Sequence, residues 1–161
     1  MQTEIIQRIA NVLRYANRIW IIGNGGSASL ADHFACDLLK NCGLPAISLC
    51  SNQALITAIA NDIAFKEVFV KQLRVLLKEG DILVAFSTRG KSPNVVSAMK
   101  YVDTKLSVAT VGIAGFGGGE LKKHSYIFYH IDSSDMQFCE DEMNRICHKI
   151  VKGVKLWEKK R

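Results

Sequence analysis

The sequence predicts an α/β fold: a three-layer α/β/α sandwich around a five-stranded parallel sheet. Five short runs rich in β-branched residues alternate with segments of helical periodicity, and such alternation is typical of parallel strands joined by right-handed crossovers. The runs are almost continuously apolar, as expected of strands that helices cover on both faces. With 161 residues, 48% of them hydrophobic, the chain has the length of one domain, and we expect a single domain over residues 1–161.

The expected elements follow one another along the chain. A charged amphipathic segment, MQTEIIQRIANVLRYANR, opens the sequence. The five expected strands then end at Gly23, Cys50, Ser87, Ile113 and Ile131. Helical periodicity marks SASLADHFACDLLKN after the first strand and SPNVVSAMKYVDTKL after the third. A last amphipathic helix, over about residues 136–158, follows the fifth strand, and we expect it to pack on a partner as well as on the sheet.

Composition excludes several functional classes. The net charge is +6, but much of the excess lies in the C-terminal VKGVKLWEKKR, which we interpret as the solvated end of a helix, so no nucleic-acid partner is expected. No run approaches the roughly 18 apolar residues of a membrane span, and the N-terminal segment does not resemble a signal peptide. The five cysteines form no CxxC pair, which favours reduced thiols in a cytoplasmic protein.

Two unusual loops follow the first and third expected strands. In an open α/β sheet of order 2-1-3-4-5, these strands are neighbours at the point where strand order reverses, which is where ligands bind. The first loop, GNGGSAS, has three glycines that allow close backbone approach and Ser27 as a natural N-cap of the next helix. The second, STRGKSPN, places Ser87, Thr88 and Ser92 around Gly90 and opens a helix with Pro93.

Hydroxyl groups and helix N-termini together favour anion binding at these loops. Either loop alone is more simply read as a capped strand-to-helix turn, whereas two of them at one switch point favour a ligand site. Neither loop has the Walker pattern, since Lys91 does not follow GxxxxG, and neither has the GxGxxG dinucleotide pattern. The sequence therefore indicates a site for one phosphate rather than for a nucleotide.

His33 and Asp37 are four residues apart, so they project from one face of the helix that follows the first loop. A histidine and a carboxylate at this spacing suit a divalent metal or a proton-transfer pair. The same spacing also occurs in ordinary hydrogen-bonded pairs on helix surfaces. From the residues alone, both interpretations stay open.

Four segments carry a family resemblance: GNGGSAS with HFACD, LITAIANDIAFKEVFVKQL, GDILVAFSTRGKSPNVVSAM and EDEMNRICHKIV. They resemble the sugar isomerase (SIS) domain proteins of the phosphoheptose isomerase type, over nearly the whole chain. The resemblance implies a flavodoxin-like five-stranded fold and a homotetramer whose active sites lie between subunits. It also implies a sugar-phosphate substrate.

The resemblance assigns roles to the two loops. It implies phosphate binding by Ser87, Thr88 and Ser92, while the first loop contacts the sugar phosphate. Arg89 and Lys91 replace the family's usual serine and asparagine, and each could contact phosphate or point to water. Asn52 stands where some relatives have a substrate-contacting aspartate. The full set of expected substrate-binding residues is Asn24, Gly25, Gly26, Ser27, Asn52, Ser87, Thr88, Arg89, Ser92 and Glu140.

The resemblance also implies a catalytic and metal-binding set. Asp37 replaces the family's catalytic glutamate, which shortens its reach by one methylene, and Glu140 and His148 match a glutamine and a histidine of the last helix. His33, Asp37, Glu140 and His148 then form a zinc-type ligand set, with zinc optional. Glu140 and His148 are separated by about 12 Å of rise and about 80° of rotation, so one metal would need long side chains, a bend or two subunits. Alternatively, Glu140 caps the first turn of its helix, and His148 packs against a neighbouring helix.

The favoured hypothesis is an aldose–ketose isomerase that converts sedoheptulose 7-phosphate to D-glycero-D-manno-heptose 7-phosphate, for heptose units of a cell-surface polysaccharide. Asp37 would move the proton through an enediol or enediolate, with His148 as the second acid or base. One alternative is a non-catalytic SIS module that binds a sugar phosphate or, like some relatives, the replication initiator. Another is an isomerase of a different sugar phosphate, which Arg89, Lys91, Asn52 and Asp37 make credible.

Overall fold

A computed structural model describes residues 2–105 and 107–158 of the chain. Its centre is a five-stranded sheet in which every pairing is parallel and the strand order is β2-β1-β3-β4-β5. The strands are β1 (Ile19–Ile22), β2 (Ala46–Ser48), β3 (Ile82–Phe86), β4 (Ala109–Ala114) and β5 (Ile127–His130). The predicted fold class and strand order are confirmed, with strand ends that differ from the predicted ones by one or two residues.

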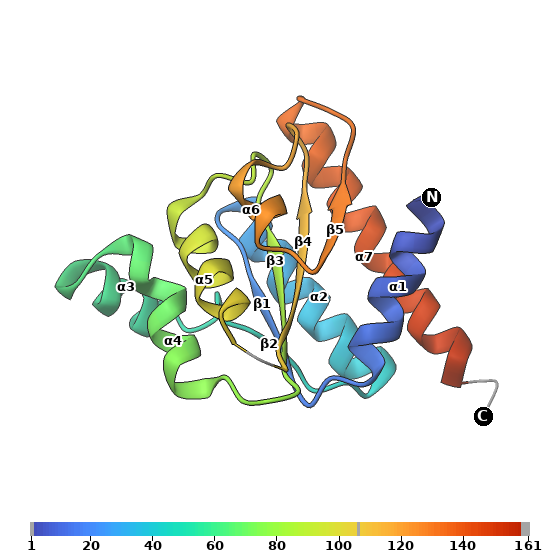
Figure 1. The fold of residues 1–161 in the computed structure, drawn as a ribbon, viewed down its shortest axis with the longest axis horizontal. Coiled ribbons are helices and arrows are strands. Elements are labelled where there is room, and N and C mark those ends of the chain that lie inside the picture. The colour runs from blue at the N-terminus through green and yellow to red at the C-terminus, as the bar shows by residue number, and fades with distance from the viewer. Residues whose placement is uncertain (1, 106, 159–161) are drawn as a thin grey trace.

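Helices cover both faces of the sheet (Figure 1). The layer on one face consists of α1 (Gln2–Arg14), α2 (Gly26–Cys42) and α7 (Met136–Glu158). The other face carries α3 (Gln53–Asp62), a 3₁₀ turn (Phe65–Glu67), α4 (Val68–Leu76), α5 (Pro93–Asp103) and the short α6 (Gly119–Lys123). No helix among residues 2–105 and 107–158 is both long enough and apolar enough to cross a bilayer.

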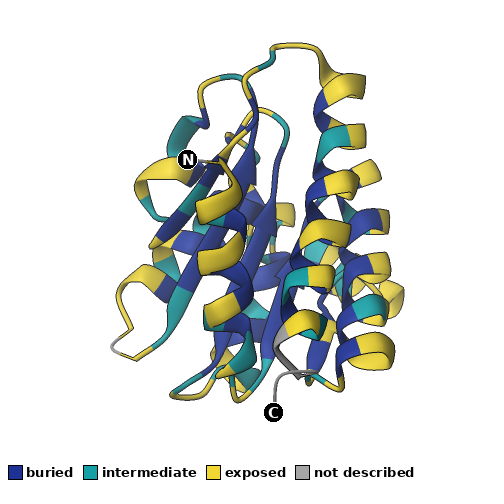
Figure 2. Ribbon diagram, turned by 90° about the vertical axis from the view of Figure 1, so that its right-hand side faces the viewer, coloured by how far each residue is buried: buried dark blue, intermediate teal, exposed yellow. Residues whose placement is uncertain are grey.

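The strands separate two hydrophobic cores, and Figure 2 shows them buried between the helices. Ile19 and Ile21 contribute to the core under α1, α2 and α7, whereas Trp20 and Ile22 contribute to the core under α4 and α5. Successive side chains of a strand point to opposite faces, so a strand covered on both sides must be apolar at every position. This explains the continuous apolar runs of the sequence.

Helix α7 follows the fifth strand, as expected, and crosses the sheet beside α1 and α2 (Figure 1). Its buried stripe, which includes Cys139, Met143, Ile150 and Val154, joins the core of that layer. Beyond this stripe Leu156 is 63% exposed. By sequence, Trp157 extends the apolar stripe of this helix together with Leu156, but its side chain lies outside the described residues.

Candidate active site

The two unusual loops meet at one edge of the sheet. Because β1 and β3 are paired, with Ile22 opposite Ala85, the segments that follow them emerge side by side. A pair of side-chain amides joins them directly. Asn24 of the first loop donates from Nδ2 to Oδ1 of Asn94 on α5, and Asn94 donates from Nδ2 to Oδ1 of Asn24, at 2.8 Å in both directions. The two loops therefore meet where the strand order reverses, and hydrogen bonds join them there.

The first loop turns more tightly than the sequence indicates. Gly25 has a φ of 55°, and its carbonyl accepts hydrogen bonds from the backbone N–H groups of Ala28 and Ser29, so α2 begins at Gly26. The prediction that Ser27 caps this helix is wrong, because Ser27 lies inside the first turn and is 5% exposed. A Cβ at Gly23 would lie 2.5 Å from the Ser27 carbonyl oxygen, so only glycine fits at this position.

The second loop presents two serine hydroxyls to one point. Ser92 occupies the N-cap position of α5 and Pro93 its first turn, as predicted, but the Ser92 side chain makes no capping hydrogen bond. Its Oγ lies 3.2 Å from Oγ of Ser87 instead. Ser87 is nearly buried and Thr88 is half-buried, so the hydroxyl pair lies at the floor of the loop. A phosphate oxygen would find two adjacent hydroxyl donors there.

The loop after β4 supports the second loop from behind. Leu121 N–H donates to the Gly90 carbonyl at 3.0 Å, and Gly115 N–H donates to the Thr88 carbonyl at 2.9 Å. Gly90 has a φ of 64°, and a Cβ there would lie 1.9 Å from the carbonyl oxygen of Gly118. This close backbone contact holds the serine loop in a fixed shape.

Arg89 lies at the rim of the serine loop and is exposed. Its guanidinium carbon is 5.4 Å from the centre of the Phe116 ring, a cation–π contact that orders a charge beside the loop. Lys91, two residues further on, is also exposed. These two cations give the rim of the loop a positive charge that favours an anionic ligand.

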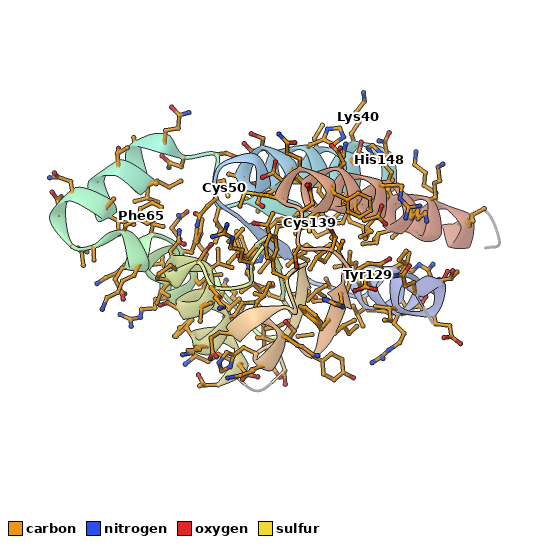
Figure 3. All side chains as sticks on the ribbon, turned by 90° about the horizontal axis from the view of Figure 1, so that it is seen from above. Lys40, Cys50, Phe65, Tyr129, Cys139 and His148 are labelled. Atoms are coloured by element: carbon orange, nitrogen blue, oxygen red, sulfur yellow. The ribbon has the colours of Figure 1, made fainter. Side chains whose placement is uncertain are left out.

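A histidine and carboxylate cluster lies on the other side of the first loop, between α2 and α7. The Nε2 atoms of His33 and His148 are 3.2 Å apart, and Oδ2 of Asp37 is 3.6 Å from the first and 3.8 Å from the second. Figure 3 labels His148 on α7, beside α2. The two histidines are about half exposed, at 51% and 48% of their side-chain surface, and Asp37 is 17% exposed.

The cluster fits a small divalent cation. Ligand atoms at about 2.0 to 2.2 Å from a tetrahedral zinc are about 3.3 to 3.6 Å from one another, close to the separations in this cluster. His33, Asp37 and His148 each offer one ligand atom within 4.8 Å of the other two. Two imidazole nitrogens and a carboxylate oxygen that face one point repel one another unless a proton or a cation lies between them. The donor set of nitrogen and oxygen is one that zinc accepts.

Neighbours of Asp37 define how it can act. Asn41, one turn further along α2, donates from Nδ2 to Oδ1 of Asp37 at 2.8 Å, which leaves Oδ2 facing the two histidines. The thiol of Cys147 is buried next to the cluster. Burial, together with the nearby charge of Asp37, raises the pKa of Cys147 well above its usual value, which keeps this thiol neutral.

Glu140 does not join this cluster. It lies on α7 two turns before His148, with its carboxylate against the N-terminus of α2: a Cβ on Gly26 would be 3.0 Å from Oε1. It is also not the cap of α7, because Asp135 accepts the hydrogen bond from Phe138 N–H at 2.7 Å. The position suits a carboxylate in a different way, since the positive end of the α2 dipole faces it.

A cleft of about 280 Å³ connects the first loop to the cluster. It is lined by residues of α2 and α7, namely Gly26, Ser27, Ser29, Leu30, His33, Glu140, Asp141, Met143 and Asn144. Six of these nine residues have polar side chains, and His33 and Glu140 are among them. The cleft has the size of a small polar metabolite.

Asn52 occupies the N-cap of α3, where its Oδ1 accepts the hydrogen bond of Leu55 N–H at 3.0 Å. The expected contact of Asn52 with substrate stays a prediction. Two residues of the site had no role in the sequence analysis: Asn94, which pairs with Asn24, and Asn41, which holds Asp37. Their signals were weak, since an asparagine in a helix is common; Asn41 is four residues after Asp37, the spacing at which side chains on a helix meet.

The family model of the SIS domain matches residues 3–115. The chain is 40% identical over 131 residues to the phosphoheptose isomerase of Nitratidesulfovibrio vulgaris strain Hildenborough, covering 78% of this chain and 62% of that one. It is 36% identical over 153 residues to the phosphoheptose isomerase of Campylobacter concisus, covering 92% and 80%. The chain thus spans less than two thirds of the length of the first of these relatives.

Among solved structures, the phosphoheptose isomerase of Neisseria gonorrhoeae superposes with a TM-score of 0.88 at 28% identity, covering 94% of this chain and 86% of that one. The phosphoheptose isomerase of Francisella tularensis gives a TM-score of 0.87, also at 28% identity, covering 95% and 85%. These matches confirm the flavodoxin-like arrangement of the sheet and its helices.

Proposed function

Since the chain belongs to the phosphoheptose isomerase family of SIS-domain proteins, we propose that it isomerises sedoheptulose 7-phosphate to D-glycero-D-manno-heptose 7-phosphate. One observation carries the proposal. A cleft runs from Gly26 of the first loop to His33 of the histidine and carboxylate cluster, and Asn24 of that loop is hydrogen-bonded to Asn94 beside the serine loop. We infer that one ligand meets an anion site at one end and proton-transfer groups at the other.

The serine loop anchors the phosphate. The hydroxyls of Ser87 and Ser92 donate hydrogen bonds to its oxygens, with Thr88 beside them and the positive end of α5 behind. Arg89 adds a charge at the rim. Binding energy from this end of the substrate, which does not react, then holds C1 and C2 of the sugar near the first loop and the cleft.

Asp37 and His148 move the protons. Oδ2 of Asp37 removes a proton from C1 of the ketose while His148 donates one to the carbonyl oxygen at C2, which gives the enediol. The proton then returns to C2, and the hydroxyl at C1 loses its proton to form the aldehyde, so the reaction is balanced without any other reactant. Asn41 holds the second carboxylate oxygen and so fixes the direction in which Asp37 acts.

His33, Asp37 and His148 would hold a zinc ion, and when bound it would polarise the carbonyl and adjacent hydroxyl of the sugar in place of proton donation by His148. Glu140, at the N-terminus of α2, contacts the sugar hydroxyls from across the cleft in this proposal. Gly25 and Gly26 let the sugar approach the backbone of the first loop closely.

We also propose that the protein is a homotetramer in the cytoplasm. The product of its reaction then supplies heptose for a cell-surface polysaccharide. Support for assembly comes from apolar side chains on a segment that stands away from the body of the molecule (Figure 1): Leu55, Ile63 and Phe65 are 38%, 54% and 53% exposed. Figure 3 labels Phe65 at the side of the view opposite His148. Light scattering at micromolar concentration tests the assembly, and a monomeric mass refutes it.

The activity is tested by incubating the purified protein with sedoheptulose 7-phosphate, with added zinc and with a chelator, and following the aldose anomeric signal by NMR. We expect conversion to an equilibrium mixture. The same protein incubated with five- and six-carbon ketose phosphates serves as the specificity control. Turnover of only a shorter sugar phosphate would identify a different substrate from the one proposed. No turnover of any of these sugars, with zinc or with chelator, would refute the proposed isomerase activity and favour a binding module.

A further inference from the structure

We propose that Asn94 is a positioning residue of the sugar-phosphate site, which sets the orientation of the Asn24 amide and locks the two ligand-binding loops together. The inference rests on the proposed function for the identity of the ligand. Its structural basis, a closed pair of amides between residues 70 positions apart in the chain, is independent of that function.

The side-chain amides of Asn24 and Asn94 are joined by two reciprocal hydrogen bonds. Each amide donates one N–H to the other and accepts one in return, both at 2.8 Å, so the two groups form a ring of two hydrogen bonds. Oδ1 of Asn94 also accepts the backbone N–H of Val95 at 3.0 Å. Asn94 is therefore held by α5, and Asn24 is held by Asn94.

Burial makes this arrangement specific. Asn94 is fully buried, whereas Asn24 is half-buried at the ligand edge of the sheet. A buried amide without partners costs free energy, so Asn94 strongly favours the paired state. Rotating the Asn24 amide by 180° would bring two oxygens and two N–H groups face to face, so only one orientation of Asn24 is stable.

That orientation determines what the first loop offers a ligand. An asparagine amide has two N–H donors and an oxygen with two lone pairs. The ring uses one donor and one lone pair of Asn24, which leaves one N–H and one lone pair at opposite edges of the amide, on either side of its Cβ. Both point in fixed directions, so one sugar hydroxyl can accept from the N–H and another can donate to the oxygen.

The pair also connects the binding of the two ends of the ligand. Asn94 lies in the first turn of α5, two residues after Ser92 of the serine loop. A displacement of α5 therefore moves the Asn24 amide as well as the hydroxyl pair. The geometry points to a role for Asn94 through Asn24, without contact with the ligand itself.

A double-mutant cycle tests this role. The dissociation constants of sedoheptulose 7-phosphate and of inorganic phosphate are measured by calorimetry for the wild type, Asn24→Ala, Asn94→Ala and the double variant. We expect each single variant to weaken sugar-phosphate binding by about fivefold to tenfold, the loss of one or two hydrogen bonds. The double variant should be within about twofold of either single one, and inorganic phosphate should be affected by less than about twofold.

The control is Val102→Ala, which truncates a fully buried side chain at the other end of α5. It destabilises the same helix and should leave sugar-phosphate binding within about twofold of the wild type. Losses that add in the double variant, an equal loss of inorganic phosphate binding, or an equal loss in Val102→Ala would each overturn the proposal.

A second measurement tests the amide pair even if the Asn94→Ala variant does not fold. It requires neither catalysis nor a ligand. In the wild type, one side-chain N–H of Asn24 should exchange with solvent at least about tenfold more slowly than the side-chain N–H groups of exposed Asn52, as observed by NMR. Asn94→Ser, which is too short to close the ring, should abolish this protection. Rapid exchange in the wild type would refute the pair even if the enzyme isomerises the sugar. Slow exchange without turnover would refute the proposed isomerase activity, whereas the amide pair would be confirmed.

Discussion

Replacement of Gly90 by alanine should separate the strain of a backbone conformation from the contact between two loops. Gly90 has a φ of 64°, a region that costs a residue with a Cβ about 1 to 2 kcal/mol. The new Cβ would in addition lie 1.9 Å from the carbonyl oxygen of Gly118, well inside contact distance. Relief of such overpacking costs about 1 to 3 kcal/mol more. We expect a total loss of about 2 to 5 kcal/mol in the free energy of unfolding.

Gly117→Ala is the matched control for Gly90→Ala. Gly117 has a φ of 80°, but a Cβ there would have no neighbour within 4 Å, so only the conformational cost of about 1 to 2 kcal/mol applies. Urea denaturation monitored by circular dichroism gives both free energies. In a chain of this size, each kcal/mol corresponds to a shift of about 2 to 4 °C in melting temperature.

The same two variants report on the ligand site. Since Gly90 cannot accept a Cβ without moving the serine loop or the loop after β4, Gly90→Ala should weaken sugar-phosphate binding by about tenfold, and Gly117→Ala should not. Equal stabilities of the two variants would refute the close contact of the loops. Unchanged sugar-phosphate affinity in Gly90→Ala would show that the ligand does not depend on the shape of this loop.

Three further outcomes are expected. The double variant Ser87→Ala with Ser92→Ala should keep its circular dichroism spectrum and lose sugar-phosphate affinity in calorimetry, at about 1.5 to 3 kcal/mol per lost hydrogen bond to a charged group; full affinity would place the anion elsewhere. Asp37→Asn should bind substrate without exchanging its C1 or C2 proton in deuterated water, and should retain less zinc; exchange at the full rate would mean that another group is the base. Iodoacetamide at pH 8 should label exposed Cys36 but not Cys147 in the native protein, because burial raises the pKa of Cys147 and keeps it as the unreactive thiol. Mass spectrometry identifies the labelled cysteines, and a label on Cys147 would contradict its burial.

The fold was predictable because its signals are repeated along the chain. Each apolar run marks a strand, and parallel pairing brings every strand's carboxyl end to one edge of the sheet, so the two loops after β1 and β3 had to meet. The helical spacing of His33 and Asp37 likewise places them on one face without knowledge of the rest of the molecule. The parallel sheet and the pairing of His33 with Asp37 follow from periodicity, whereas the meeting of the two loops also depends on the strand order of the flavodoxin-like fold that the family resemblance implies.

Predictions that depend on local backbone geometry or on contacts between distant segments were less successful. Ser27 has the composition of an N-cap, but the positive φ of Gly25 begins α2 earlier and buries the serine. Glu140 shares a helix with His148, yet a separation of two turns takes it to the N-terminus of α2 and not to the metal cluster. Asn94 has no periodic signal, because its partner Asn24 belongs to another loop.

The two histidines that face each other across α2 and α7 are 115 positions apart in the chain. During synthesis, the ribosome completes the serine loop and both sheet neighbours of β3 well before it releases the second histidine. Closing so long a segment carries a large entropic cost, which is recovered only when α7 docks on the finished sheet. The capacity to hold a cation therefore requires that α7 is docked beside α2. Metal uptake during refolding, followed with a chromophoric chelator, would report the docking of this one helix rather than the formation of the sheet.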